Sequence, residues 1–482
     1  MTKHAGFGDT ARVDMSRLPS ETKLEAEGVV FSFRDGTSGD RLVLSRPLPG
    51  FSGERSTEGE IACPLTPENA FALRERFPWL RPCRIRDGAT SFGFGDRLGM
   101  ATPGHVRALR NSGVFPVLAQ QSVRENARTG RSFDGVLADA IFGAFRQGYR
   151  SGFGADADHL KTPRNAVNAA RLGYTFFTCD PGDVVHPTEA MAHDEVRSRF
   201  AELPDGEGIR RRYQDRSHSI GGSVLRFTDE ALLRASVKYT EAIDRAAEMY
   251  RALVEAIGRD FDYEVSVDET ETPTTPLEHL FITLELHRRG VEFTSLAPRF
   301  VGAMEKGVDW RGDVLQFERD LCQHAAIARE MGGYRLSLHS GSDKFTLYPL
   351  LARATGGLCH VKTAGTSYLV ALDVVARRRP NLFREIAAQS IASFVDDRAT
   401  YHISADPSRI PPLETVPDRG LPELVAAHDS RQVLHVAYGS ILSSPLGERL
   451  RSVLREQEEE HLAALAGHLG RHIAALEVRK GV

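Results

Sequence analysis

The sequence predicts an α/β protein built on a (β/α)8 barrel. From about residue 88, short apolar runs that end in polar or glycine residues alternate with amphipathic helical segments. This alternation is typical of βα units and a parallel sheet. Eight strand-like runs precede residue 366, and eight is the number that closes a barrel. An open, doubly wound sheet is the alternative fold.

Each predicted strand is followed by residues that can turn the chain, such as Gly95-Asp96 after the first and His339-Ser340-Gly341 after the seventh. In order, the eight strands are Thr90–Phe94, Phe115–Ala119, Gly152–Ala157, Tyr174–Thr178, Tyr263–Val267, Val291–Leu296, Tyr334–Leu338 and Leu358–Val361.

Helical spacing of apolar residues appears between most of these strands. Gly290 follows one of the helical segments, where a C-cap glycine is expected. The segments are Phe133–Arg146, Pro163–Leu172, Asp229–Ile257, Pro276–Arg289 and Asp313–Met331.

The chain is long for one domain, with 482 residues, and two further regions flank the predicted barrel at 88–366. Residues 1–87 predict a small β-containing cap with one helix at Pro67–Arg76. Residues 367–482 predict a helical extension packed on the barrel. Its expected helices are Ser367–Arg379, Phe383–Val395 and one terminal helix at Glu448–Leu476.

Composition excludes several classes of protein. The net charge of −4 provides no strong field for nucleic acid or anionic membranes, and no run of eighteen apolar residues occurs. The arginine-rich run Ile209–Arg216 is interpreted as a solvated loop. The N-terminus lacks a secretory apolar segment, so a cytoplasmic location is expected. Five scattered cysteines without a Cys-x-x-Cys pair argue against a disulfide framework or a zinc ribbon.

Charged residues gather at the predicted strand ends, where barrel enzymes place their catalytic groups. Asp156 and Asp158 share one strand face and His159 follows them, a cluster that suits a divalent metal or an acid/base pair. Alternation directs His339 into the barrel and places His360 beside Lys362.

Asp268 and Glu269 end the fifth predicted strand, and either could act as an acid/base. The glycine string Gly93–Gly99 has the spacing G-x-G-x-x-x-G, which is not the dinucleotide fingerprint. A nicotinamide cofactor is therefore disfavoured. A Walker loop and a G-x-S-x-G elbow are also absent from the sequence.

Four motifs together resemble the tagaturonate epimerase family. They are GFGDRLGMATPG at 93–104, GADADHLKT at 154–162, LHSGSDKF at 338–345 and KTAGTSY at 362–368. The resemblance extends from about residue 88 to the C-terminus. It implies a metal-dependent epimerase that interconverts D-tagaturonate and D-fructuronate in hexuronate catabolism. Retro-aldol cleavage and re-addition is one route to that change, and direct proton abstraction or transient oxidation are alternatives.

Read with this resemblance, the strand-end residues receive expected roles. His159, His339 and His360 are the expected ligands of a divalent ion, for which zinc, manganese, nickel and iron are all suitable. Asp158, Asp268 and Glu269 are the candidates for proton transfer or a fourth ligand. Arg97, Lys344 and Lys362 are expected to hold the substrate carboxylate, and Gln121 to bind a sugar hydroxyl.

Two other functions remain open from the sequence. A class II-type aldolase or keto-sugar isomerase would share the barrel, the metal and an anionic substrate. A catalytically silent sugar-acid binding protein is the third possibility, although the many charged strand ends argue against it. The long terminal helix could pack on its own barrel or on a partner subunit, which is compatible with a homo-oligomer.

Overall fold

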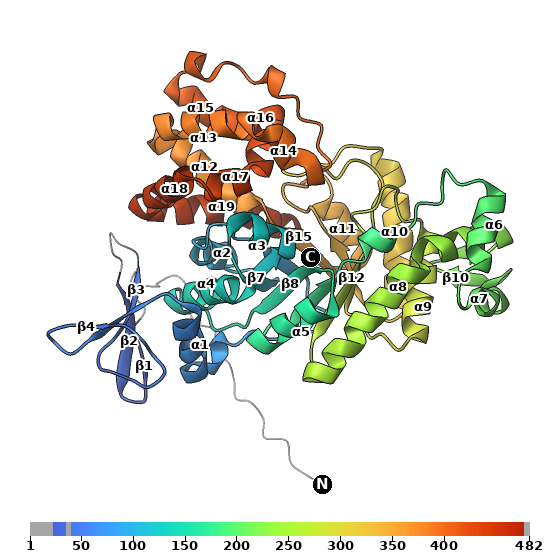
Figure 1. The fold of residues 1–482 in the computed structure, drawn as a ribbon, viewed down its shortest axis with the longest axis horizontal. Helices are drawn as coiled ribbons and strands as arrows, with labels where there is room; N and C mark the ends of the chain where they lie inside the picture. Colours follow the sequence, from blue (N-terminus) through green and yellow to red (C-terminus); the bar gives the residue numbers. More distant parts are fainter. Residues whose placement is uncertain (1–22, 35–39, 477–482) are drawn as a thin grey trace, which may run out of the picture.

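The computed structural model describes residues 23–34 and 40–476, and at its centre eight parallel strands form a closed barrel (Figure 1). The barrel closes where β15 pairs with β6, with His360 opposite Ser91. All eight predicted strands are present, which confirms the (β/α)8 barrel and excludes the open sheet. They are β6 (Ser91–Phe94), β7 (Phe115–Ser122), β8 (Gly154–Leu160), β9 (Phe176–Cys179), β12 (Asp262–Ser266), β13 (Ser295–Ala297), β14 (Arg335–Leu338) and β15 (Cys359–Thr363).

Helices connect these strands, and several of their ends follow from capping residues. The Thr162 side chain accepts from the amide of Asn165 at the start of α5, and Gly173 ends that helix in the left-handed region. Thr275 and Glu278 form a capping box at the start of α9. The barrel helices are α2 (Thr102–Ala108), α3 (Val123–Thr129), α4 (Phe133–Arg146), α5 (Pro163–Leu172), α8 (Asp229–Ile257), α9 (Pro276–Arg288), α10 (Val314–Glu330) and α11 (Tyr348–Thr355).

A small antiparallel sheet and a short helix precede the barrel. Phe33 of the sheet contacts the rings of Phe142 and Phe145 on α4, which attaches the sheet to the barrel. Residues 1–22 of the predicted cap and residues 477–482 of the predicted extension lie outside the described residues. The elements are β1 (Leu24–Ala26), β2 (Val29–Arg34), β3 (Arg41–Leu44), β4 (Glu54–Arg55), β5 (Ile61–Pro64), α1 (Pro67–Arg76) and η1 (Pro78–Leu80).

The predicted loop at Ile209–Arg216 is wrong, because most of it is helical. Helix α7 (Gly206–Tyr213) buries Ile209 and Tyr213, and the Tyr213 hydroxyl donates to Glu285 at 2.7 Å. Two apolar residues four positions apart form one buried helix face, although arginines dominate the segment. Neighbouring elements of this insertion are η2 (Gly182–Val184), α6 (His193–Ala201), β10 (Ser217–Ile220) and β11 (Ser223–Arg226).

The C-terminal region is helical as predicted and lies over one end of the barrel (Figure 1). The single terminal helix predicted at Glu448–Leu476 is instead two helices, which meet at Gln457. The helices are α12 (Thr366–Arg378), α13 (Pro380–Ala392), α14 (Phe394–Asp397), α15 (Leu421–Ala426), α16 (His428–Val436), α17 (Tyr438–Leu442), α18 (Pro445–Glu456) and α19 (Glu458–Leu476), with short η3 (Arg398–Thr400), η4 (Pro407–Arg409), η5 (Leu413–Thr415) and η6 (Asp418–Gly420).

Helix α19 returns to the barrel wall. It packs against α2 and α11, and its leucines, Leu462, Leu465 and Leu469, belong to the barrel core. Gly104 of α2 allows this close approach, because a Cβ there would lie 2.7 Å from the Cβ of Leu465. Within the described residues, no helix is both long and apolar enough to span a bilayer.

Candidate active site

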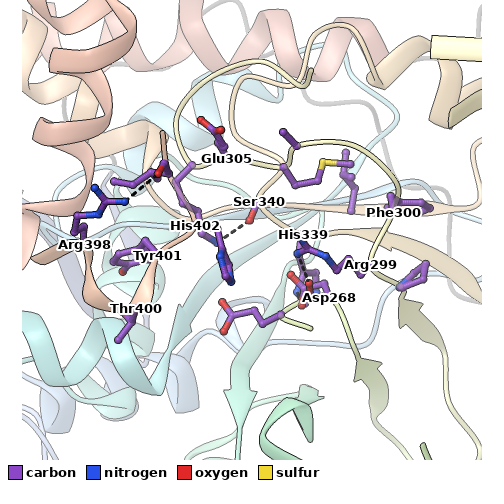
Figure 2. A pocket seen from close by; sticks show the side chains of 17 residues that line it. Asp268, Arg299, Phe300, Glu305, His339, Ser340, Arg398, Thr400, Tyr401 and His402 are labelled. Carbon is purple, nitrogen blue, oxygen red and sulfur yellow. Dashed lines mark hydrogen bonds and ion pairs between the residues drawn. The ribbon is translucent and has the colours of Figure 1, made fainter. Parts of the chain in front are cut away.

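A cavity opens at the carboxyl ends of the barrel strands (Figure 2). Its outer lobe, of about 420 Å³, is lined by the segments after β12, β13 and β14 and by residues 398–403 from the C-terminal region. A narrower inner lobe reaches Asp158 and Lys362. The two lobes adjoin, since Lys306, His339, Ser340 and Tyr401 line both. The cavity therefore lies where barrel enzymes hold their reacting groups.

Two histidines and a carboxylate meet in this cavity. One ligand atom from each of His159, Asp268 and His339 lies within 4.8 Å of the others. His339 Nδ1 is 3.0 Å from Asp268 Oδ1. His159 Nε2 is buried without a hydrogen-bond partner and lies 3.8 Å from the same oxygen. Glu269 adds a carboxylate oxygen 3.9 Å from His159 Nε2.

An irregularity in the barrel brings His159 into this group. Successive side chains of a regular strand point to opposite faces, which would separate Asp158 from His159. The pairing of β8 with β9 shifts register between Ala157 and Leu160, and His159 adopts a left-handed φ of 53°. Both side chains therefore reach the cavity, and His159 Nδ1 lies 2.8 Å from Asp158 Oδ1.

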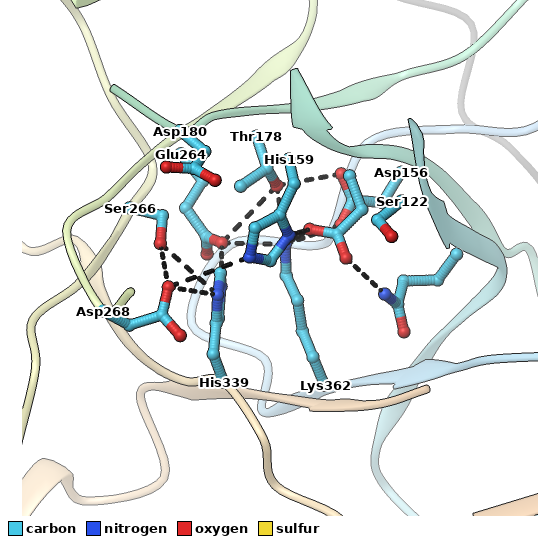
Figure 3. A network of polar contacts seen from close by, with 12 residues as sticks. Ser122, Asp156, His159, Thr178, Asp180, Glu264, Ser266, Asp268, His339 and Lys362 are labelled. Carbon is cyan, nitrogen blue, oxygen red and sulfur yellow. Dashed lines mark hydrogen bonds and ion pairs between the residues drawn. The ribbon is translucent and has the colours of Figure 1, made fainter. Parts of the chain in front are cut away.

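Carboxylates that surround the group orient both histidines (Figure 3). His159 donates from Nδ1 to Asp158, and His339 donates from Nε2 to Glu264 at 2.6 Å. The other two ring nitrogens, His159 Nε2 and His339 Nδ1, face Asp268. His339 Nδ1 also lies 3.3 Å from Ser266 Oγ, whereas His159 Nε2 has no hydrogen-bond partner. The ammonium of Lys362 lies 2.8 Å from both Asp158 and Glu264 and 2.7 Å from Asp156.

The carboxylates create a strongly negative potential at the two histidines. Burial lowers the pKa of a histidine, but Asp158 and its neighbours outweigh burial and raise the pKa of His159 to about 10. The same balance, with Asp268 as the main partner, raises the pKa of His339 to about 9. Positive charge is thus favoured at this point, and a divalent cation would supply it. The donor set and the unpartnered Nε2 fit such an ion.

Of the other residues expected at the site, Arg97, Asp158 and Lys362 line the inner lobe. Arg97 is buried and already paired with Glu125 at 2.8 Å. Its second amino group donates to the carbonyl of His435 at 3.2 Å. Arg97 therefore joins the barrel to the C-terminal helices rather than presenting a free charge.

His360 does not join His159 and His339 in the cavity. It lies two residues before Lys362 on β15, deeper in the barrel, where its Nδ1 is 2.9 Å from Ser91 Oγ and its ring is 5.3 Å from Phe176. Burial lowers its pKa to about 3. Within the described chain, two groups here could hold a metal ion, and neither contains His360: one is His159, Asp268 and His339, and the other is His159, Asp180 and Glu269.

Lys344 and Gln121 also lie away from the cavity walls. Lys344 is fully buried, and its ammonium donates to three backbone carbonyls. Gln121 accepts from Arg131, whereas its neighbour Gln120 lines the inner lobe and donates to Asp158 at 2.8 Å.

Sequence reasoning did not nominate Glu264, Gln120, Lys306 or Tyr401. The sequence contained a signal for two of these four residues, Glu264 and Lys306. Glu264 is a charged residue inside a predicted strand, which is costly unless it is paired. Lys306 belongs to a segment of some fifteen residues between β13 and α10, long for a βα connection and therefore a candidate functional loop.

The closed barrel and the acid-rich cavity at its strand ends define a (β/α)8-barrel enzyme. A sequence model of the tagaturonate epimerase family matches residues 49–476. The chain belongs to the tagaturonate epimerase family. This confirms the resemblance of its motifs and the expected class, an isomerase that acts as an epimerase.

Relatives agree with this assignment. The chain is 51% identical over 416 residues to the tagaturonate/fructuronate epimerase of Thermotoga maritima, and the match covers 86% of each chain. The native crystal structure of the fructuronate-tagaturonate epimerase from Cohnella laeviribosi matches with a TM-score of 0.90 at 37% identity, covering 94% of this chain and 95% of that one. A crystal structure of the same Cohnella enzyme with glycerol gives the same values.

Proposed function

We propose that this chain is a metal-dependent epimerase that interconverts D-tagaturonate and D-fructuronate. The observation that supports it is that one cavity contains both a group that could hold a metal ion and the cation Lys306. The chain that forms this cavity belongs to the tagaturonate epimerase family. A cavity of about 420 Å³ is in the range of small-molecule sites and accommodates a six-carbon sugar acid. A cytoplasmic location and the absence of a nucleic-acid partner remain predictions.

His159, Asp268 and His339 would hold the metal ion. When bound, the ion supplies Lewis-acid polarisation of the ketone and hydroxyl oxygens of the sugar. Asp158 and Glu264 act as positioning residues, because each accepts the proton-bearing nitrogen of one ligand histidine.

Glu269 is the residue we assign to proton transfer. Asp268 is a ligand in this proposal, and the buried oxygens of Asp158 already accept from His159, Lys362 and Gln120. Glu269 is paired with Arg124, but its carboxylate is partly exposed and lines the outer lobe, where substrate can reach it. Burial would raise the pKa of Glu269, but His159, Lys306 and Arg124 outweigh it and lower the pKa to about 2. The carboxylate is therefore ionised and can accept a proton from the hydroxyl at the epimerised carbon.

The retro-aldol route uses that proton transfer twice. Glu269 removes the hydroxyl proton, the bond to the neighbouring carbon breaks, and its electrons remain on an enediolate fragment. The aldehyde fragment then rotates to present its other face, the carbon–carbon bond re-forms, and Glu269 returns the proton to the new hydroxyl. Atoms and charge balance, and the mass of the sugar is unchanged.

The test combines metal analysis with turnover. Purified protein is assayed for bound metals, and D-tagaturonate is followed by NMR with and without a chelator. We expect conversion to D-fructuronate that stops on chelation and returns with a divalent ion. Release of smaller fragments would instead indicate an aldolase, and conversion after complete metal removal would contradict the metal assignment.

Glu269→Gln gives a second test of the mechanism. We expect kcat to fall about 10²- to 10⁴-fold, the usual contribution of a general acid–base, while bound metal stays at the wild-type level. Glu271→Gln, an exposed acid two residues further along, is the matched control and should keep wild-type turnover. Unchanged kcat in Glu269→Gln would rule out this role.

A further inference from the structure

Lys306 is a cation in the cavity whose charge has no carboxylate partner. Its ammonium donates to Ser340 Oγ at 2.7 Å. Its charge acts on the carboxylate of Glu269, but among the described residues no carboxylate lies within ion-pair distance of the ammonium. Ser340 follows His339 directly, so Lys306 lies beside the ligand group and lines both lobes. A half-buried ammonium of this kind is an available site for an anion.

The loop that carries Lys306 is held rigidly. Four consecutive carbonyls, from Glu305 to Val308, each accept from a side chain. Lys344 donates to the first at 2.9 Å and to the last at 2.5 Å. Gln432 donates to the carbonyl of Lys306 at 3.3 Å, and Arg431 donates to that of Gly307. With its backbone fixed, the loop holds the Lys306 side chain at the junction of the lobes, which reduces the entropy lost when an anion binds.

The other cations around the cavity are less suited to that role. Arg124 is paired with Glu269 at 2.7 Å. Arg398 is exposed at the rim and donates to the carbonyl of Ile403. Arg299 donates to the carbonyl of Asp268 at 3.3 Å and lines only the outer lobe. Lys306 alone among these combines a free charge with contact to both lobes.

We infer that Lys306 binds the carboxylate of the substrate and selects ketose acids over neutral ketoses. The inference rests on the proposed function, which places the ketone end of the sugar at His159, Asp268 and His339. The carboxylate, four carbons along the chain from the ketone, would then meet Lys306, which lies beside this group and lines both lobes. A neutral ketose, with CH2OH in place of the carboxylate, would leave the ammonium desolvated and unpaired, which weakens its binding.

Lys306→Met tests the inference, because methionine keeps most of the length of the side chain and removes the charge. We expect KM for D-tagaturonate to rise about tenfold to a hundredfold, the range of a lost charge-assisted hydrogen bond. KM for the corresponding neutral ketohexose should change less than about threefold, and Lys306→Arg should recover part of the loss. Arg319→Met removes an exposed charge on α10 outside both lobes and is the control for net charge.

A binding measurement on chelated protein separates this inference from the proposed function. D-galactonate, an unreactive six-carbon acid, should bind the wild type more tightly than galactitol, and Lys306→Met should abolish that preference. Wild-type protein that fails to convert D-tagaturonate would count against the proposed function alone. Equal KM and equal D-galactonate affinity in Lys306→Met would overturn the inference, as would loss of acid preference in Arg299→Met but not in Lys306→Met.

Discussion

One lysine of the barrel, Lys362, neutralises the carboxylates that orient His159 and His339. Lys362 was expected to hold the substrate carboxylate, but its ammonium is surrounded by Asp156, Asp158 and Glu264. Two of these carboxylates accept from the ligand histidines, so Lys362 compensates the charge that fixes their tautomers. Removing Lys362 itself would leave three buried carboxylates without a counter-ion, so its partners are the better targets for substitution.

Glu264→Gln should weaken metal binding without contacting the metal. The amide has no negative charge, and its NH2 group can donate to His339 Nε2 where the carboxylate only accepts. The ring of His339 can therefore change tautomer. We expect the metal dissociation constant to rise about 10- to 100-fold, as for other partners of ligand histidines. Competition with a chromogenic chelator measures the constant, and circular dichroism checks the fold. Unchanged affinity in Glu264→Gln would show that His339 does not depend on this hydrogen bond.

For single residues, the sequence could not always predict which side chains of a strand point into the barrel. The predicted strand ends placed His159, His339, Asp268 and Glu269 at one barrel end, because parallel strands end together. The pairing of β7 with β8 is irregular between Val117 and Ala119, so alternation counted along the sequence does not identify Gln120 as the inward residue. Lys306 and Lys344 both follow strand ends in the sequence. Only the packing of the loops shows that Lys306 lines the cavity whereas Lys344 is buried.

Among the elements, strands and barrel helices were predicted well because periodicity and caps agree. Helix α5, for example, begins after Thr162 and ends at Gly173, both visible in the sequence. The break between α18 and α19 was not visible, because amphipathic spacing continues through Gln457 and no proline or glycine interrupts it. After the break, α19 packs against α2, and periodicity within one sequence does not reveal such a tertiary contact.

Asp343 links two C-terminal helices to the loop between β14 and α11. Its carboxylate accepts from His468 of α19 and from Arg431 of α16, each at 2.7 Å. Asp343→Asn keeps a residue that tolerates the left-handed φ of 59° and removes the charge. We expect the free energy of unfolding at pH 7 to fall by about 3 kcal/mol, as for a broken buried ion pair.

The pH dependence of that loss has a definite sign. Burial would raise the pKa of Asp343, but His468 and Arg431 outweigh it and hold the pKa well below its usual range. A lowered carboxyl pKa stabilises the folded state above the unfolded pKa of about 4, and the contribution is lost as pH falls below it. Urea unfolding should therefore show a smaller difference between wild type and variant at pH 3.5 than at pH 7. Asp396→Asn, an exposed acid on α14, is the control.

On the scale of the whole molecule, the cavity lies between two hydrophobic cores. One contains the barrel, the N-terminal sheet and α19, and the other contains most of the C-terminal helices. The barrel supplies His159, Asp268 and His339, and also Lys344, which holds the Lys306 loop. The C-terminal region supplies Tyr401 and the two other side chains that hold this loop, Arg431 and Gln432. Metal bound in the cavity should consequently stabilise the folded chain as a whole.

Thermal unfolding with added Zn²⁺, Mn²⁺, Ni²⁺ or Fe²⁺ measures that stabilisation. An ion that binds only the folded state adds about 4 kcal/mol at a thousand times its dissociation constant, so the wild-type Tm should rise by a few degrees and fall again with chelator. His159→Ala should remove the shift, because it deletes the unpartnered Nε2 that faces Asp268. His360→Gln should retain the shift, since His360 lies deeper in the barrel beside Ser91 and Phe176. The opposite pattern, a shift lost in His360→Gln and kept in His159→Ala, would show that the ion binds one layer further down the barrel than the geometry of His159, Asp268 and His339 indicates.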